Sequence, residues 1–407
     1  MVPNEWEILS LSQVSKVIDC KHRTPHYVES GIPLISPGTI KWGALDLTSP
    51  TKRVTEDEYQ SLMDHCTVEI GDLVMSRNQS VGVLSFVDSM KPFVLGQDTV
   101  LIKAEKSDSK YLFYKIQSEE VQKRIVRLAG GSTFARINLA DIRKLILECP
   151  PLVEQKKIAQ ILSTWDQAIS ATEKLLENSQ QQKKALMQQL LTGKKRLLDE
   201  NGVKFSEEWK KGKLNDLVKI DSGFAFKSSD FTNSFDGVPI IRMSDFKNGG
   251  LDIREAAKVS KEITNSLQRF RLNSGDFVFG MSGSLSNYGW VKEKDLPCYL
   301  NQRVGRLVAN EQGDQKFVTY LYLSEKVQQS IIDKAAGAAQ LNISVNDLRG
   351  IQVFYPVKEE QQKIAKIISV ADKEIEILQK KLDCLKQEKK ALMQQLLTGK
   401  KRVKVAA

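Results

Sequence analysis

A fourteen-residue string, KKALMQQLLTGKKR, occurs twice in the chain, from Lys183 to Arg196 and again from Lys389 to Arg402. The two copies lie 206 residues apart. The same offset separates EQKKIAQILS at Glu154 from EQQKIAKIIS at Glu360. A string of this length does not recur by chance, so the chain contains an internal duplication. Either its unchanged length is a functional constraint, as in a spacer, or the duplication is recent and has not drifted.

Each duplicated stretch is predicted to form one long helix. Its residues follow the 4-3-4-3 spacing of a coiled-coil seam. In the first copy this seam comprises Ile158, Leu162, Trp165, Ile169, Thr172, Leu176, Ser179, Lys183, Leu186 and Leu190. Prolines precede both copies and glycines follow them, which is the expected chemistry of helix starts and stops.

A helix over residues 154–191 would be roughly 57 Å long, too long to be buried in one small domain. Its narrow apolar seam needs a partner, and the second copy has the matching length and register. We expect the two copies to pair antiparallel, as a two-fold repeat requires. The alternative is that each helix pairs with another protein.

The 407-residue chain therefore divides into a globular unit over 1–150, a helix over 151–198, a second unit over 199–355 and a helix over 356–407. Short apolar runs broken by Gly and Pro predict a strand-rich body in the first unit. They are GIPLISPG, IGDLVMS, VGVLSFV and FVLGQDTVLIK. Helices are predicted at about 109–128 and 139–144, followed by a strand in LILECPP. The expected fold class is α+β.

The second unit repeats the first loosely and in the same order. GIPLISPGTI matches GVPIIRMSDF, IGDLVMS matches SGDFVFG, and LGQDTVLI matches LNQRVGRL. The framework agrees while the loops differ. One interpretation is two readers of two different targets, and the other is neutral drift on an unimportant surface.

Composition adds a weak preference for an anionic partner, because the net charge is +10 and the pI is near 9.1. The five scattered cysteines form no CxxC and indicate free thiols in a reducing compartment. The first residues lack a signal-peptide pattern, and no run of 18 apolar residues predicts a membrane span. We expect a cytoplasmic protein without a membrane partner.

At the level of motifs, PPLVEQKKIAQIL, its echo YPVKEEQQKIAKII and the helix end LMQQLLTGK resemble the specificity subunit of type I restriction-modification systems. DSGFAFKSSDF, VPIIRMSDF and SGDFVFG share the resemblance, which covers the whole chain. It implies two target-recognition domains, each followed by a conserved helix. It further implies a non-catalytic subunit that recognises a bipartite, asymmetric double-stranded DNA target and docks two modification subunits, with restriction subunits joining that core.

The residues themselves agree with a protein that binds and does not catalyse. TGKK at Thr192 lacks the upstream glycine of a phosphate-binding loop, and no GxGxxG follows a strand. We therefore expect no catalytic residue and no cofactor. His22 and His26 have HxxxH spacing, but Pro25 disfavours a helix there and no third ligand is near, so we expect no metal site.

DNA-reading residues are expected in polar loops, because Arg, Lys, Asn, Gln and Ser read base edges and hold phosphates. In the first unit the candidates are Lys21, His22, Arg23, Tyr27, Arg77, Asn78, Gln79, Ser132, Thr133 and Arg136. In the second unit they are Phe226, Lys227, Ser228, Arg242, Ser284, Asn287, Tyr288, Gln340 and Asn342. For each residue the alternative is an ordinary solvated turn.

A second function class stays open, in which the chain is a two-domain coiled-coil scaffold whose globular units bind proteins. Salt discriminates the two classes, because counterion release makes DNA binding fall steeply as salt rises.

Overall fold

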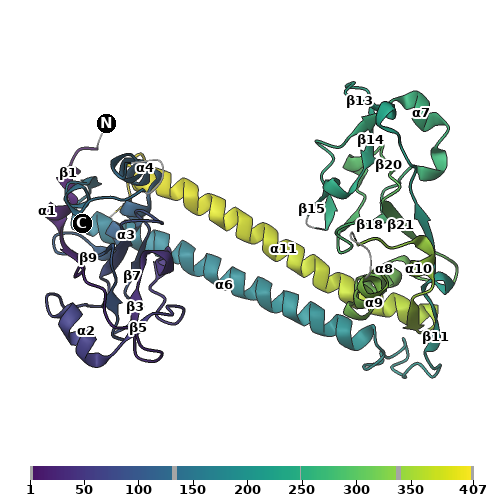
Figure 1. Cartoon of the computed structure of the whole chain (residues 1–407), viewed down its shortest axis with the longest axis horizontal. Coiled ribbons are helices and arrows are strands. Elements are labelled where there is room, and N and C mark those ends of the chain that lie inside the picture. The colour runs from purple at the N-terminus through teal and green to yellow at the C-terminus, as the bar shows by residue number, and fades with distance from the viewer. Residues whose placement is uncertain (1–2, 131–134, 248, 336–340, 405–407) are drawn as a thin grey trace. The chain divides into compact units, whose positions relative to one another are not determined.

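The structure is a computed structural model that describes residues 3–130, 135–247, 249–335 and 341–404. The chain forms two compact units, shown in Figure 1. Unit 1 comprises Met1–Lys174 and Gln379–Ala407, and unit 2 comprises Leu175–Leu378. The division between the units therefore runs through both long helices, whereas the predicted domain boundaries lie at the ends of those helices.

Unit 1 is built on a five-stranded sheet with the order β2-β9-β6-β7-β4. Its strands are β2 (Ser15–Asp19), β9 (Thr99–Ala104), β6 (Leu73–Ser76), β7 (Leu84–Phe86) and β4 (Gly43–Ala44). A three-stranded sheet has the order β5 (Arg53–Val54), β3 (Ile32–Ile35) and β8 (Val94–Leu95). An outer antiparallel pair joins β1 (Glu7–Ser10) to β10 (Ile146–Cys149). The apolar runs of the sequence thus form strands, and β6 is buried along its whole length.

The helices of unit 1 are α1 (Leu11–Val14), α2 (Glu56–Met63), α3 (Ser109–Gln117), α4 (Glu119–Leu128) and α5 (Leu139–Arg143), with a 3₁₀ turn η1 (Pro37–Thr39). The single helix expected at 109–128 is wrong, because Ser118 interrupts it. Ser118 has extended backbone, caps α3 at its end and precedes α4. Its hydroxyl donates to the carbonyl of Lys115, which is the local bond by which serine competes with helical structure.

Unit 2 repeats this plan with a four-stranded sheet of order β12-β21-β18-β19 and a second sheet of order β13-β17-β14-β20. The first contains β12 (Val218–Ser222), β21 (Val304–Ala309), β18 (Phe277–Gly280) and β19 (Tyr288–Trp290). The second contains β13 (Phe231–Thr232), β17 (Lys258–Val259), β14 (Val238–Ile241) and β20 (Tyr299–Leu300). Two antiparallel pairs complete it: β11 (Lys210–Lys213) with the distant β22 (Gln352–Tyr355), and β15 (Phe246–Lys247) with the neighbouring β16 (Gly250–Leu251).

The shorter helices of unit 2 are α7 (Lys261–Asn265), α8 (Gln315–Leu323), α9 (Glu325–Ala335) and α10 (Val345–Arg349). Its 3₁₀ turns are η2 (Leu214–Asp216), η3 (Ser228–Asp230), η4 (Met243–Asp245), η5 (Gln268–Phe270) and η6 (Glu293–Asp295). β14 pairs parallel with β20, as β3 does with β8 in unit 1. Four strands of the main sheets also follow the same order, β2-β9-β6-β7 and β12-β21-β18-β19, which confirms the repeat expected from the sequence.

The two long helices are α6 (Leu152–Leu190) and α11 (Lys358–Leu396), each 39 residues long. Within unit 1 the first part of α6 lies antiparallel to the last part of α11, since Asp166 pairs with Lys389 and Glu173 with Lys386. Within unit 2 the last part of α6 lies antiparallel to the first part of α11, where Lys183 pairs with Asp372. The predicted α+β fold with an antiparallel helix pair and an internal two-fold repeat is confirmed.

The seam positions carry the packing of the helices onto each unit. Ile158 and Leu162 are fully buried in the main core of unit 1, and Ile364 and Ile368 are fully buried in that of unit 2. Leu396 and Leu397 from the end of α11 join the first core, as Leu190 and Leu191 join the second. Each domain body therefore shares one core with both helices. In the part of the chain that the structure describes, no helix is long and apolar enough to cross a membrane.

Candidate nucleic-acid interface

The start of each long helix is fixed to its domain by a buried Glu-Gln pair. Arg402 makes two bonds of 2.8 and 2.9 Å to the carboxylate of Glu154, and Arg196 makes two of 2.8 Å to Glu360. The next residue in each copy, Gln155 or Gln361, accepts a bond of 2.9 Å from the backbone of an aspartate that caps a helix. The Glu-Gln of the repeated motif is thus internal structure and does not face a partner.

A second set of contacts repeats at the same 206-residue offset. The Asp166 carboxylate accepts from the Tyr114 hydroxyl at 2.6 Å and from Lys389 at 2.5 Å. Asp372, Tyr320 and Lys183 repeat the arrangement with the same two distances. Burial, together with the bond to the aspartate, raises the pKa of both tyrosines well above its ordinary value. The duplication has therefore kept the side-chain contacts as well as the sequence of the helices.

The two copies differ beneath these conserved contacts. In unit 1 the buried Lys115 lies 2.7 Å from Glu148, which also binds Arg124 at 2.7 Å. The corresponding residues of unit 2 are Leu321, Phe354 and Ser330. Burial alone would raise the pKa of Glu148, but the bonds from Lys115 and Arg124 outweigh it and lower that pKa. One unit therefore holds an ion-pair network where the other has only uncharged side chains.

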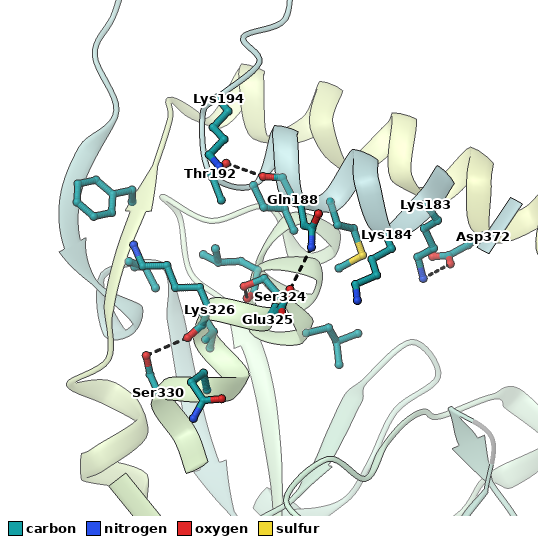
Figure 2. A pocket seen from close by; sticks show the side chains of 18 of the residues that line it. Lys183, Lys184, Gln188, Thr192, Lys194, Ser324, Glu325, Lys326, Ser330 and Asp372 are labelled. Atoms are coloured by element: carbon teal, nitrogen blue, oxygen red, sulfur yellow. Dashed lines mark hydrogen bonds and ion pairs between the residues drawn. The ribbon is translucent and has the colours of Figure 1, made fainter. Parts of the chain in front are cut away.

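A cavity of about 1260 Å³ lies beside Leu321 and Phe354 in unit 2, between α6, α9 and β22. Figure 2 shows Lys184, Lys194 and Lys326 among the residues around it. Within the described residues, none of these three lysines forms an ion pair, although Lys326 lies 4.8 Å from the Phe354 ring. The cavity lining thus combines apolar side chains with three lysines that form no ion pair in the described part of the chain, beside the acidic Glu325 and Asp372.

Several predicted DNA-reading residues of unit 1 are tied to acidic neighbours. Lys21 binds Asp64 at 2.7 Å, His22 binds Asp19 at 3.0 Å and Arg23 binds Glu58 at 2.5 Å. Hydrogen bonds from Arg23 and Lys21 lower the pKa of Glu58 and Asp64, respectively. These side chains are partly exposed, but Asp64 and Glu58 neutralise the charges of Lys21 and Arg23.

The structure gathers Asp19 and Cys20 around His22, with potential ligand atoms within 4.8 Å of one another. Arg77, which is only 5% exposed, donates to Asp19 at 2.9 Å and to the carbonyl of Ile137. Burial raises the pKa of the Cys20 thiol. The Asp19 carboxylate is thus engaged by the Arg77 guanidinium and the His22 ring. Arg77 supports the loop from inside and presents no side chain for a base.

A smaller cavity of about 230 Å³ brings together four of the predicted residues from separate loops. They are Arg23, Tyr27, Asn78 and Gln79. Asn78 donates to Asp98 at 2.7 Å, and Arg136 lies 2.6 Å from the same aspartate. Four of the eight unit 1 candidates that the structure describes thus converge on one cavity. Ser132 and Thr133 lie outside the described residues.

In unit 2 the candidates are more dispersed. Phe226 is buried in an aromatic cluster, 5.0 Å from the Phe224 ring, so it serves as core and not as a contact. Lys227 and Ser228 are exposed at a turn, and Arg242 lies 6.0 Å from the Phe231 ring. The hydroxyl of Ser284 donates to Asn287 at 3.1 Å, Tyr288 is half-buried in β19, and Asn342 is exposed opposite Ser282. Gln340 lies outside the described residues.

Matched backbone bonds align the loops of the two units residue by residue. Arg77 donates to the carbonyl of Asp98 at 2.8 Å, as Met281 does to Arg303 at 2.9 Å. Ile137 donates to Arg77, as Ile343 does to Met281. Asp98 therefore corresponds to the exposed Arg303, which sequence reasoning missed. Arg303 could have been found from the alignment of LGQDTV with LNQRVG, because an arginine replaces the aspartate in otherwise similar strings.

The same alignment places Gln79 opposite Gly283, because the preceding strands β6 and β18 also match, with Ser76 bonded to Val83 as Gly280 is to Asn287. Both residues are left-handed, with φ of +54° for Gln79 and +73° for Gly283. Glycine adopts this conformation freely, whereas a residue with a side chain is strained there by about 1–3 kcal/mol. Unit 1 therefore keeps a side chain where the fold favours glycine.

Comparison with known proteins agrees with this architecture. Residues 3–179 and 206–387 both match the family described as the type I restriction modification DNA specificity domain. The chain is 28% identical to the type I restriction enzyme MjaVIII specificity subunit of Methanocaldococcus jannaschii, over 99% of this chain and 94% of that protein. It is 24% identical to the EcoBI specificity subunit of Escherichia coli, over 68% and 62% of the two chains.

Among solved structures, the S subunit of the type I restriction-modification system of M. genitalium superposes with a TM-score of 0.61 at 17% identity. The match covers 100% of this chain and 99% of that one. A chain from a study of complex assembly and conformational transition of the type I R-M system superposes with a TM-score of 0.58 at 16% identity, over 98% of both chains. These likenesses concern the fold, and the two family matches span most of the sequence. The chain therefore belongs to the type I restriction modification DNA specificity domain family, with one copy of the domain in each half.

Proposed function

We propose that this chain is the DNA-recognition subunit of a type I restriction-modification complex in the cytoplasm. Each unit reads one half of a bipartite, asymmetric double-stranded target. The chain itself catalyses nothing. It docks two modification subunits, and restriction subunits join that core.

The observation that carries the proposal is the contrast between the helices and the loops. The contacts of Asp166 and Asp372 are repeated at the same distances, whereas Asp98 of one loop corresponds to Arg303 of the other. Conserved helix contacts combined with opposite charges at matching loop positions favour two domains that recognise different DNA sequences. Arginine favours guanine, so Arg303 would give unit 2 a base preference that Asp98, which is paired with Arg136 at 2.6 Å, would not give unit 1.

The partner-docking part of the proposal rests on the exposed residues of the repeat. Lys156 and Lys157 at the start of α6 and Gln188 and Gln189 near its end are exposed, unlike the Glu-Gln pair. The cavity of unit 2 is a further docking feature, beside Leu321 and Phe354, whose counterparts in unit 1 are the ion-paired Lys115 and Glu148. The three lysines of its lining that form no ion pair among the described residues suit a partner surface that carries carboxylates beside an apolar side chain.

Selection from a randomised duplex DNA library tests the reading function. The full chain, with any subunits that co-purify, should enrich two short conserved blocks separated by an unspecified gap. The affinity should fall steeply between 50 and 200 mM salt. A protein-binding scaffold would enrich no blocks.

Native mass spectrometry of the assembled complex tests the docking. Two modification subunits per chain are expected with excess partner. Saturation at one modification subunit would contradict the two-fold docking scheme.

A further inference from the structure

Gln79 has a left-handed backbone conformation, which is unfavourable for a residue with a side chain. Its φ is +54°, and the residue at the matching position of unit 2 is Gly283. The loop in unit 2 therefore shows that the turn closes without any side chain there. Strained residues of this kind persist where a specific side chain is needed, most often at binding sites.

The Gln79 side chain has no structural duty in the part of the chain that the structure describes. It is exposed, and none of the hydrogen bonds found there involves its amide group. The Gln79 amide lies close to Gly38: a Cβ added at Gly38 would be only 3.2 Å from the Gln79 Oε1 atom. Neither burial nor a hydrogen bond thus accounts for keeping glutamine at this position.

The surroundings of Gln79 are those of a reading site. It lines the cavity of about 230 Å³ together with Arg23, Tyr27, Asn78 and Gln97. Asn78 directs its amide nitrogen to Asp98 and leaves its Oδ1 without a hydrogen-bond partner. The free amide of Gln79 therefore stands beside other polar groups that are held in place.

We propose that Gln79 is a specificity-determining residue of unit 1 that reads an adenine through its amide, an inference that rests on the proposed DNA-recognition function. A glutamine amide offers one donor and one acceptor, which match the N7 and N6 groups of adenine in the major groove. Unit 2 has no counterpart, because Gly283 carries no side chain. The adenine contact therefore belongs to one half-site only.

The test compares the wild-type chain with Q79G in two measurements: selection from the randomised duplex library and thermal unfolding. Q79G should lose the preference for adenine at one position of one block, by about 5- to 100-fold. Its unfolding midpoint should stay unchanged or rise by up to about 4 °C, because glycine relieves the left-handed strain. The other block should stay as it is.

Two further variants sharpen the result. Q79E keeps the size and removes the donor, so it should lose the same adenine preference without a fall in the midpoint. G283Q installs the glutamine in unit 2 and should lower the midpoint, which measures the strain that Gln79 bears.

The outcomes are decisive in each direction. A lost preference with an unchanged or raised midpoint supports the inference. An unchanged motif in Q79G overturns it, as does a clear fall in midpoint with a general loss of binding, because the side chain would then be structural. Loss of preference at a G·C pair would overturn the adenine assignment. If the wild-type chain enriches no motif, the proposed function itself fails and the inference falls with it.

Discussion

Lys115 and Glu148 form a buried ion pair of 2.7 Å in unit 1, and the residues at the same two positions of unit 2 are Leu321 and Phe354. Lys115 also donates to the carbonyl of Leu397, just past the end of α11, at 2.6 Å. The same two positions of the fold thus hold an ion pair in one unit and two apolar residues in the other. The comparison allows the ion pair to be tested against a natural apolar substitute.

The first prediction exchanges that pair. The single variant E148A should lower the free energy of unfolding by about 3–5 kcal/mol, because it leaves Lys115 buried without a counter-charge. The double variant K115L/E148F, which copies unit 2, should recover most of this loss. Urea unfolding measures both, with K123A as a control at the exposed Lys123–Glu119 pair. That control should change stability by less than about 1 kcal/mol. A double variant as unstable as E148A would show that the apolar residues of unit 2 cannot replace the ion pair of unit 1.

The second prediction concerns pH. The folded-state pKa of Glu148 is lowered below its ordinary value of 4.5, so its contribution to stability is present above pH 4.5. That contribution is lost as the pH falls through the folded pKa. The stability difference between the wild type and E148Q should therefore narrow below pH 4.5. Urea titrations from pH 3 to 7 measure it, and a difference that stays constant over this range would exclude Glu148 as a titrating contributor.

The third prediction concerns Arg303, which is exposed and forms no ion pair within the described residues. R303A should weaken binding of the selected duplex and relax one position of one half-site, at a cost of about 1–3 kcal/mol if the guanidinium reads a base. The matched control is R254A, because Arg254 is also exposed in unit 2 but is bound to Asp252 at 2.6 Å. Equal losses for both variants would show a general effect of charge and no reading role for Arg303.

The fourth prediction uses the length of the long helices. Four residues inserted after Ser179 and four after Leu385, its equivalent in α11, add about 6 Å to each helix. A coiled coil absorbs a four-residue insertion by local unwinding. At about 3.4 Å per base pair, the gap between half-sites should lengthen by one or two base pairs, with both half-sites unchanged. Insertions of two residues rotate the seam by roughly 200° and should abolish assembly. A longer helix with an unchanged gap would show that the helices are not the spacer.

The two long helices were predictable from the sequence because the pattern that identifies them occurs twice. The offset between the copies of KKALMQQLLTGKKR located both helices, and the apolar seam identified the faces that Ile158 and Ile364 bury. The partner of Lys183, which occupies a seam position, was not predictable. Antiparallel pairing was expected, but no local pattern encodes the register that sets Asp372 against Lys183 in unit 2.

The candidate site was less predictable, since exposure is not a property of a short string. Arg77 and Gln79 stand two residues apart in SRNQS, yet the first is buried against Ile137 and the second is exposed. The left-handed backbone of Gln79 could not be predicted from the sequence either, because glycine is the residue that normally indicates this conformation. Comparison with Gly283 supplies that signal only once strand pairing has aligned the loops.

The most direct test of the account replaces residues 1–150 with the equivalent unit of another family member and maps the methylated DNA motif in cells that contain the partner subunits. Each unit has its own core and its own loops, so one half-site should change while the other half-site and the gap stay as they were. A motif in which both halves change together, or in which neither changes, would contradict the claim that each unit reads one half of the target.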